Sequence, residues 1–198
     1  MPGAGPMRPA AFEVFLIGVI AMAAITLHTA SVSVLCKFLR NLRHLLLKAQ
    51  GDAAARGYDE QALVHFRLSP DMHPLRRQVF YACDISQMAV ARIAGLNASV
   101  AEHTENTLPE LIGRIERTLA WLESVPASSV DGREAHEIVW TGGDGNARRM
   151  LAAAYVQFWT LPNVMFHITT SYNILRHNGV VLGKLDFLNG PEADPLVG

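Results

Sequence analysis

Apolar side chains recur three and four residues apart along four long segments of this chain, and this spacing constrains the fold more than any other feature. The segments are residues 27–50, 75–94, 108–125 and 147–179. Such spacing places the apolar side chains on one face of an α-helix, so each segment predicts an amphipathic helix with one face to bury. In the first segment this face is Leu27, Val32, Leu35, Phe38, Leu39, Leu42, Leu45, Leu46 and Ala49.

Four such helices, joined by short connections and with hardly any strand pattern, predict an all-α protein. The simplest way to bury four apolar faces is a four-helix bundle. A length of 198 residues fits one domain, and a hydrophobic content of 50% supplies a sizeable core.

Local signals mark where the helices begin and end. Thr107 followed by Glu110 is typical of a capping box, and Gly95 is placed to end the helix before it. Asp71 is interpreted as the cap of the helix at 75–94, with Pro74 in its first turn. Residues 59–68 predict only a brief helical turn or two.

The segment before the last helix breaks the helical pattern. Residues 136–140 (HEIVW) alternate as a strand does, and residues 141–146 (TGGDGN) have the composition of a turn. We therefore expect a small hairpin or an irregular flap here. In the last helix Pro162 predicts a kink or a fresh start, and Gly179 predicts the end.

Residues 1–26 differ from the remainder. The apolar run at 14–27 is shorter than the roughly 18–20 residues that span a bilayer. Three interpretations stay open: a misassigned start, with Met22 as the first residue; a single membrane anchor; and a signal peptide with Arg8 as its charged end. We expect a cytoplasmic protein, or a membrane-anchored one if the segment is retained as an anchor.

Charge limits the expected partners of this protein, and the cysteine positions limit its expected chemistry. The 17 basic and 18 acidic residues are interspersed, with no basic stripe, so we expect no nucleic-acid partner. Cys36 and Cys83 lie within apolar helical patterns and are interpreted as buried, unreactive side chains.

Two stretches resemble a known family. They are "LSPDMHPLRRQ" at 68–78 and "LPNVMFHITTSYNILRHNGVVLGKLDFL" at 161–188. Together they resemble an uncharacterised branch of the DinB/YfiT-like superfamily, over residues 27–188, which leaves 189–198 as a loose tail. The resemblance implies an up-down-down-up helical bundle, often a homodimer. Better-known relatives bind a divalent metal through three histidines and include thiol transferases and hydrolases.

The relatives' ligands do not all carry over to this chain. The resemblance implies one histidine from the second helix and an H-x-x-x-H pair on the fourth. Here the fourth helix has Asn163 and His167 in those places, and His73 precedes the second helix. An amide is a weak ligand for zinc or nickel, so we assign no metal ligands and leave the cofactor unknown. His177 is ten residues from His167, about 15 Å along a helix, which is too far to share an ion.

Asn163 and His167 nevertheless lie one turn apart, on one face of a mostly apolar helix. We predict that they project inward toward the turn that carries Asp71 and His73, and that Tyr172 completes a polar cavity that binds a small molecule. If the protein is an enzyme, His167 is the candidate acid–base group. The alternatives are a metal-dependent thiol transferase or hydrolase with a degenerate ligand set, and a non-catalytic dimerisation module.

Overall fold

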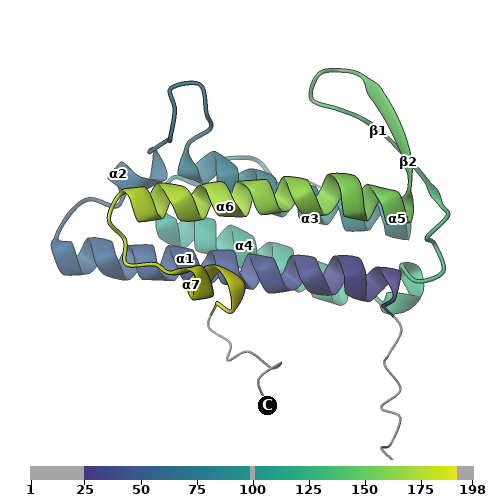
Figure 1. Ribbon diagram of the computed structural model, residues 1–198, viewed down its shortest axis with the longest axis horizontal. Coiled ribbons are helices and arrows are strands. Elements are labelled where there is room, and N and C mark those ends of the chain that lie inside the picture. The colour runs from purple at the N-terminus through teal and green to yellow at the C-terminus, as the bar shows by residue number, and fades with distance from the viewer. Residues whose placement is uncertain (1–24, 99–100, 191–198) are drawn as a thin grey trace, which may run out of the picture.

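The computed structural model describes residues 25–98 and 101–190 (Figure 1). Most of the described chain is helical, and its only sheet has two strands. The elements, with η1 and η3 as π-helices and η2 as a 3-10 helix, are η1 Thr29–Ser33, α1 Val34–Arg56, α2 Gln61–Val64, α3 Leu75–Ala94, α4 Leu108–Ser124, η2 Ala127–Ser129, β1 Glu137–Thr141, β2 Ala147–Leu151, α5 Ala152–Tyr155, η3 Val156–Thr160, α6 Leu161–His177 and α7 Lys184–Leu188. The predicted mainly helical fold is confirmed.

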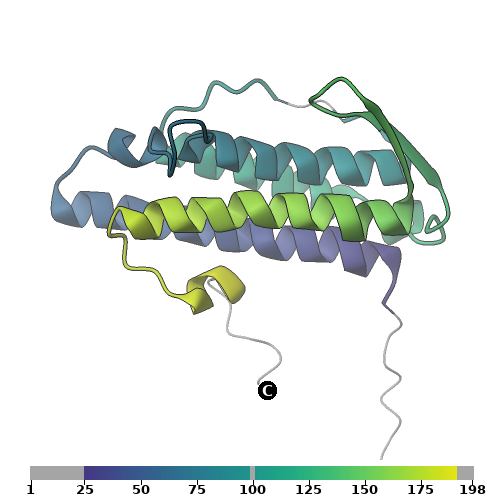
Figure 2. The same ribbon diagram turned by 45° about the horizontal axis from the view of Figure 1, so that its top comes forward.

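The long helices α1, α3, α4 and α6 lie side by side (Figures 1 and 2). Both α1 and α3 pack against both α4 and α6. The shared core includes fully buried leucines of α1, each of which contributes roughly 1.5–3 kcal/mol on burial. They are Leu35, Leu39, Leu42, Leu45 and Leu46.

Side-chain pairs give the relative directions of these helices. Along α1, Arg40 pairs with Glu123 at 2.6 Å and Arg43 with Glu116 at 2.7 Å, so α1 and α4 run antiparallel. Gln78, near the start of α3, forms a hydrogen bond with His167, whereas Arg92, near the end of α3, forms one with Tyr155, which comes earlier in the sequence than His167. The continuous helix α5–η3–α6 therefore runs antiparallel to α3.

Several predicted boundaries are confirmed. The Thr107 hydroxyl accepts a hydrogen bond from the Glu110 N–H, and the Glu110 carboxylate accepts one from the Thr107 N–H, so the capping box is complete. Gly95 ends α3 with φ +70°, a conformation that glycine adopts without strain. The predicted hairpin is β1–β2, with Glu137 opposite Leu151. Both cysteines are buried.

Other boundaries were predicted wrongly. Helix α1 runs through Gly51 to Arg56 instead of ending at Gln50, because alanines favour the helix, Arg56 pairs with Asp52 one turn earlier at 2.9 Å, and the left-handed Gly57 ends it. Residues 147–151 form strand β2, not the start of the last helix, because pairing with β1 outweighs their helical propensity. The N-cap of α3 is Pro74, and the Asp71 side chain does not cap that helix.

Pro162 lies inside a helix that continues past it. The N–H of Leu161 bonds the carbonyl of Val156, five residues back, so the preceding turn is a π-turn. The π-turn, with its wider hydrogen-bond spacing, lets the helix continue past Pro162, which has no N–H to donate to the helix. The expected kink or fresh start is thus a local change of helix type, and α6 follows without a loop.

The described residues 101–107 of the α3–α4 connection run back alongside α3 to the start of α4 (Figure 2). A buried arginine anchors it. Arg114 of α4 donates to the carbonyl oxygens of Ala101 and Glu102, and also bonds Asp84 at 2.6 Å and Glu105 at 3.1 Å. Burying a guanidinium is tolerated here because it is paired with carboxylates and carbonyls.

No helix in residues 25–98 and 101–190 is long and apolar enough to cross a membrane. The proposed N-terminal extension falls, except for its last two residues, outside the described residues, as does nearly all of the C-terminal tail.

Candidate functional site

His167 projects from α6 toward α3. Its Nδ1 lies 2.7 Å from Oε1 of Gln78, a side chain that is only 1% exposed. The other end of the Gln78 amide, Nε2, donates to the backbone carbonyl of His73 at 2.8 Å. One buried glutamine therefore joins the imidazole of α6 to the turn before α3.

These bonds determine the tautomer of His167. The carbonyl of His73 can only accept, so the amide nitrogen of Gln78 faces it and the amide oxygen faces His167. An amide oxygen also only accepts, so Nδ1 of the imidazole carries the proton. In the neutral ring, Nε2 then has a lone pair, and no described residue donates a hydrogen bond to it.

The surroundings keep this imidazole neutral. Burial in the helix interface, with a smaller contribution from the charge of His73, lowers the pKa of His167 to about 4. Burial disfavours the charged imidazolium because the interface solvates it less well than water does. At neutral pH, His167 is therefore a neutral hydrogen-bond acceptor at Nε2.

Tyr81 of α3 lies at the centre of a group of aromatic rings. Its ring centroid is 5.3 Å from that of His167 and 5.1 Å from that of His73, and His103 meets it edge-on at 6.1 Å. The guanidinium of Arg77 lies 5.8 Å from the same centroid. The Tyr81 ring thus lies between His73 and His167. These two histidines were predicted to share a site, but the sequence did not show which residue joins them.

Asn163 lies one helical turn before His167. Its side chain is half-buried and forms no hydrogen bond with a described residue. Since the two positions are about 40° apart around the helix, the amide lies beside the imidazole on the same face of α6.

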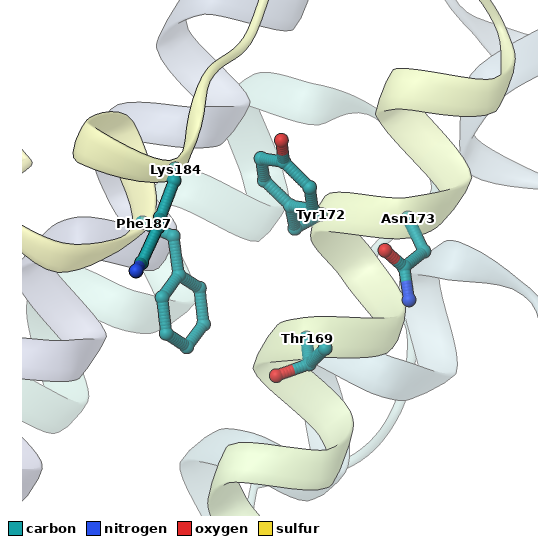
Figure 3. A pocket seen from close by; sticks show the side chains of 5 residues that line it. All are labelled: Thr169, Tyr172, Asn173, Lys184 and Phe187. Atoms are coloured by element: carbon teal, nitrogen blue, oxygen red, sulfur yellow. The ribbon is translucent and has the colours of Figure 1, made fainter.

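The structure does not bring Asp71 or Tyr172 into this group. Asp71 is exposed, and its carboxylate accepts a hydrogen bond from the Ser69 hydroxyl at 2.6 Å, which lowers its pKa. Tyr172 lies about 140° around α6 from His167 and faces α7, where it lines a different pocket (Figure 3). Of the five predicted site residues, His73 and His167 are joined through Gln78 and Tyr81, and Asn163 shares the face of α6 that carries His167.

Gln78 and Tyr81 were not among the site residues predicted from the sequence. Gln78 occupies a position in the apolar stripe of α3, between Leu75 and Val79, and is as buried as they are. A polar side chain within an apolar stripe needs a partner, and that was the available signal. It could not identify His167 as the partner.

A second polar group lies next to this one and was also missed. Nε2 of His103 lies 2.6 Å from the Asp84 carboxylate, whose other oxygen bonds Arg114, and the imidazole stacks on Phe80 at 4.6 Å. Asp84 and Arg114 are both about 5% exposed or less. Because the buried charges are paired with one another, we interpret this group as structural.

The described residues do not fit a three-ligand metal site. Nowhere in residues 25–98 and 101–190 do three or more His, Cys, Asp or Glu side chains come together in a way that could hold an ion. His167 by itself resembles a metal ligand, since its Nδ1–H is held by Gln78 and its Nε2 has a lone pair. Its neighbour Asn163, however, offers only an amide, so we derive no metal-dependent step.

Comparison with known proteins places the chain in a family. A family model described as a domain of unknown function, DUF1993, matches residues 27–188. The solved structure of a DinB family member protein from Shewanella denitrificans is similar, with 34% sequence identity and a TM-score of 0.76. That alignment covers 85% of this chain and 96% of the other. A comparison with curated proteins gives no match. Since the family model spans most of the sequence, the chain belongs to the DUF1993 family, an uncharacterised group with a DinB-like structural relative.

Proposed function

We propose that the polar side chains between α3 and α6 bind a small molecule, and that Nε2 of His167 accepts a hydrogen bond from it. The observation that carries this proposal is the chain of hydrogen bonds from His73 through Gln78 to His167. A buried glutamine that fixes one imidazole tautomer leaves a single lone pair in a fixed direction. Pre-organised acceptors of this kind orient ligands in binding sites.

The neighbouring groups supply complementary contacts. The Asn163 amide can both donate and accept, and the Tyr81 ring is only half-buried, so it offers a flat apolar surface beside the imidazole. The ligand would therefore have a hydrogen-bond donor for His167 and an apolar or planar part for Tyr81.

The low pKa favours one of the roles open to His167. With a pKa of about 4, roughly one molecule in a thousand carries the imidazolium at pH 7, so the free protein has almost no general acid at this position. A general base works best with a pKa near the operating pH. We therefore propose hydrogen-bond acceptance as its main role, and proton abstraction only if a bound ligand raises this pKa.

We further propose that the four long helices form a DinB-type bundle in up-down-down-up order. The antiparallel pairs α1 with α4 and α3 with α6 support this order, as does the similarity to the Shewanella denitrificans protein. In such a bundle the second and fourth long helices are neighbours, which is the pair that carries the proposed site.

Two His167 variants test the binding proposal. His167→Asn places an amide N–H where the Nδ1–H was, so it can keep the bond to Gln78, but it has no Nε2. His167→Ala removes both. We expect ligands found in an NMR screen of small polar metabolites against the native protein to lose binding to both variants, while the His167→Asn variant keeps its fold. Undiminished binding to His167→Asn would rule out the Nε2 role.

Metal analysis separates this proposal from the metal-dependent alternative. The purified protein is assayed for zinc, nickel and iron before and after incubation with each ion. The small-molecule proposal predicts less than stoichiometric metal. One ion per chain that is lost in His167→Ala would favour the thiol transferase or hydrolase alternative.

A dimerisation role is the second candidate, and one observation favours it. Phe158 and Phe166 lie along the η3–α6 helix with 71% and 56% of their surfaces exposed. Large exposed apolar side chains along one helix suit a two-fold contact between copies, in which the same surface serves both partners. Sedimentation of the native protein and of a Phe158→Ser/Phe166→Ser variant tests it. A dimer that the double variant dissociates supports the proposal, and a monomeric native protein contradicts it.

A further inference from the structure

The short helix α7 folds back onto α1 and α6 and forms one side of an open surface pocket of about 180 Å³ (Figure 3). Thr169, Tyr172 and Asn173 of α6 form one side of it, and Lys184 and Phe187 of α7 form the other. This pocket is separate from the His167 site, because Tyr172 faces away from His167 around α6.

Helix α7 is held firmly in place, so the pocket exists before any ligand binds. The buried Asn41 amide of α1 donates to the carbonyl oxygens of Phe187 and Leu188 at 2.8 and 2.9 Å. Asp186 lies 2.9 Å from Lys48 and 3.0 Å from His44, both of α1. Burial alone would raise the pKa of Asp186, but the hydrogen bonds from Lys48, the Gly183 N–H and His44 lower it to about 2.

Two aromatic rings form the apolar part of the pocket. Phe187 meets Tyr172 edge-on, with 6.4 Å between ring centroids, and packs against Phe38 of α1 at 5.5 Å. Contact with Phe38 limits how far the Phe187 ring can move. A flat apolar group of a ligand would therefore meet ordered rings and need not reorganise them.

The polar part of the pocket favours an anion. Lys184 is exposed and pairs with no carboxylate in the described part of the chain. The nearest acid along the chain, Asp186, is already neutralised by Lys48. In Figure 3 the Lys184 side chain runs along one side of the Phe187 ring, and Thr169 lies on the other side of that ring. The Thr169 hydroxyl and the Asn173 amide add two groups that can donate hydrogen bonds.

From this combination we propose that the α6–α7 pocket binds a small carboxylic acid with an aromatic or otherwise flat apolar body. The carboxylate accepts from Thr169 or Asn173 and pairs with Lys184, whose exposed, flexible side chain rotates past the edge of the Phe187 ring to reach it. The apolar body lies against Tyr172 and Phe187. Size restricts the class further. A volume of 180 Å³ holds roughly six water molecules at about 30 Å³ each, below the roughly 300 Å³ at which drug-sized sites begin.

The test compares benzoate with benzamide, which has nearly the same shape and no charge. Each is titrated up to roughly 10 mM into the full-length isotope-labelled protein, and backbone amide shifts are followed by NMR. Benzoate should shift the signals of residues 169–173 and 184–187 and bind about tenfold more tightly than benzamide. A tenfold difference in Kd corresponds to about 1.4 kcal/mol, which is the order of energy that an ion pair at a protein surface contributes.

Three variants identify the group responsible. Lys184→Gln should weaken benzoate binding about tenfold and leave benzamide binding unchanged, whereas Lys184→Arg should stay within about twofold of the native protein. Arg149→Gln removes one exposed positive charge from the distant hairpin and should change neither. His167→Asn should also bind benzoate normally, so that failure of this proposal and failure of the His167 proposal are distinguishable.

Several results would overturn the proposal. One is equal binding of benzoate and benzamide. Another is a set of benzoate-induced shifts that lie outside α6 and α7. A third is the absence of any shift up to 10 mM. The proposal also fails if Lys184→Gln and Arg149→Gln weaken benzoate binding equally, because the attraction would then come from overall charge and not from this pocket.

Discussion

The low pKa of His167 makes the stability of the fold depend on pH in a specific range. An imidazole titrates near 6.5 in the unfolded chain, and burial lowers the pKa of His167 to about 4 in the native state. Between these values the unfolded chain binds a proton that the native protein does not. The contribution of His167 to stability is therefore complete above pH 6.5 and is lost as the pH falls toward 4.

The magnitude follows from the two pKa values. The full difference corresponds to about 3 kcal/mol, and at pH 5.0 about 2 kcal/mol of it has been lost relative to pH 7.5. His167→Asn can keep the hydrogen bond to Gln78 but cannot titrate in this range. The variant should therefore lose about 2 kcal/mol less stability than the native protein between pH 7.5 and 5.0.

Urea unfolding, followed by circular dichroism at both pH values, measures this difference. Replacing the exposed histidine His65 by Gln controls for the loss of any one histidine. The His167 ring signals, followed by NMR, give the native pKa directly. Equal loss of stability in the native protein and in His167→Asn, or a ring titration centred near pH 6.5, would refute the argument from burial.

Two further predictions concern the same site and the helix ends. Gln78→Glu places a carboxylate against the Nδ1–H of His167 and should raise the pKa of His167 by about one unit or more, because a nearby negative charge favours the imidazolium. An NMR titration that gives an unchanged or lower pKa contradicts the assigned contact. Thr107→Ala removes the cap of α4 and should lower the free energy of unfolding by about 1 kcal/mol. Ser124→Ala, at the exposed end of the same helix, should lower it less. Equal losses of the two variants in urea unfolding contradict the capping role.

Local sequence rules predicted the helices well because the relevant interactions lie within a few residues. The capping box at Thr107, the left-handed Gly95 and the strand before the hairpin turn are all of this kind. The same rules failed at residues 147–151, where pairing with β1 decides the conformation. They also failed at Asp71, since two prolines and the bond from Leu75 N–H to Phe66 O set the path of the chain before α3.

The candidate site was predictable only in part. The spacing of Asn163 and His167 placed both on one face of α6 correctly. The five-residue spacing of His167 and Tyr172 places the two side chains about 140° apart around the helix, so the prediction that they share a cavity contradicted helix geometry. The partners Gln78 and Tyr81 lie on α3, about ninety residues earlier. Nothing in the local pattern specifies which turn of α3 meets which turn of α6.

By itself the sequence determined the helical class of the protein, most helix boundaries and the polar face of α6, because helix periodicity and capping depend on neighbouring residues. Only the tertiary structure decided that Gln78 fixes the tautomer of His167, that burial lowers its pKa, and that α7 forms a pocket with Tyr172. These features depend on how the buried faces of separate helices pack against one another, and that packing is a property of the whole core.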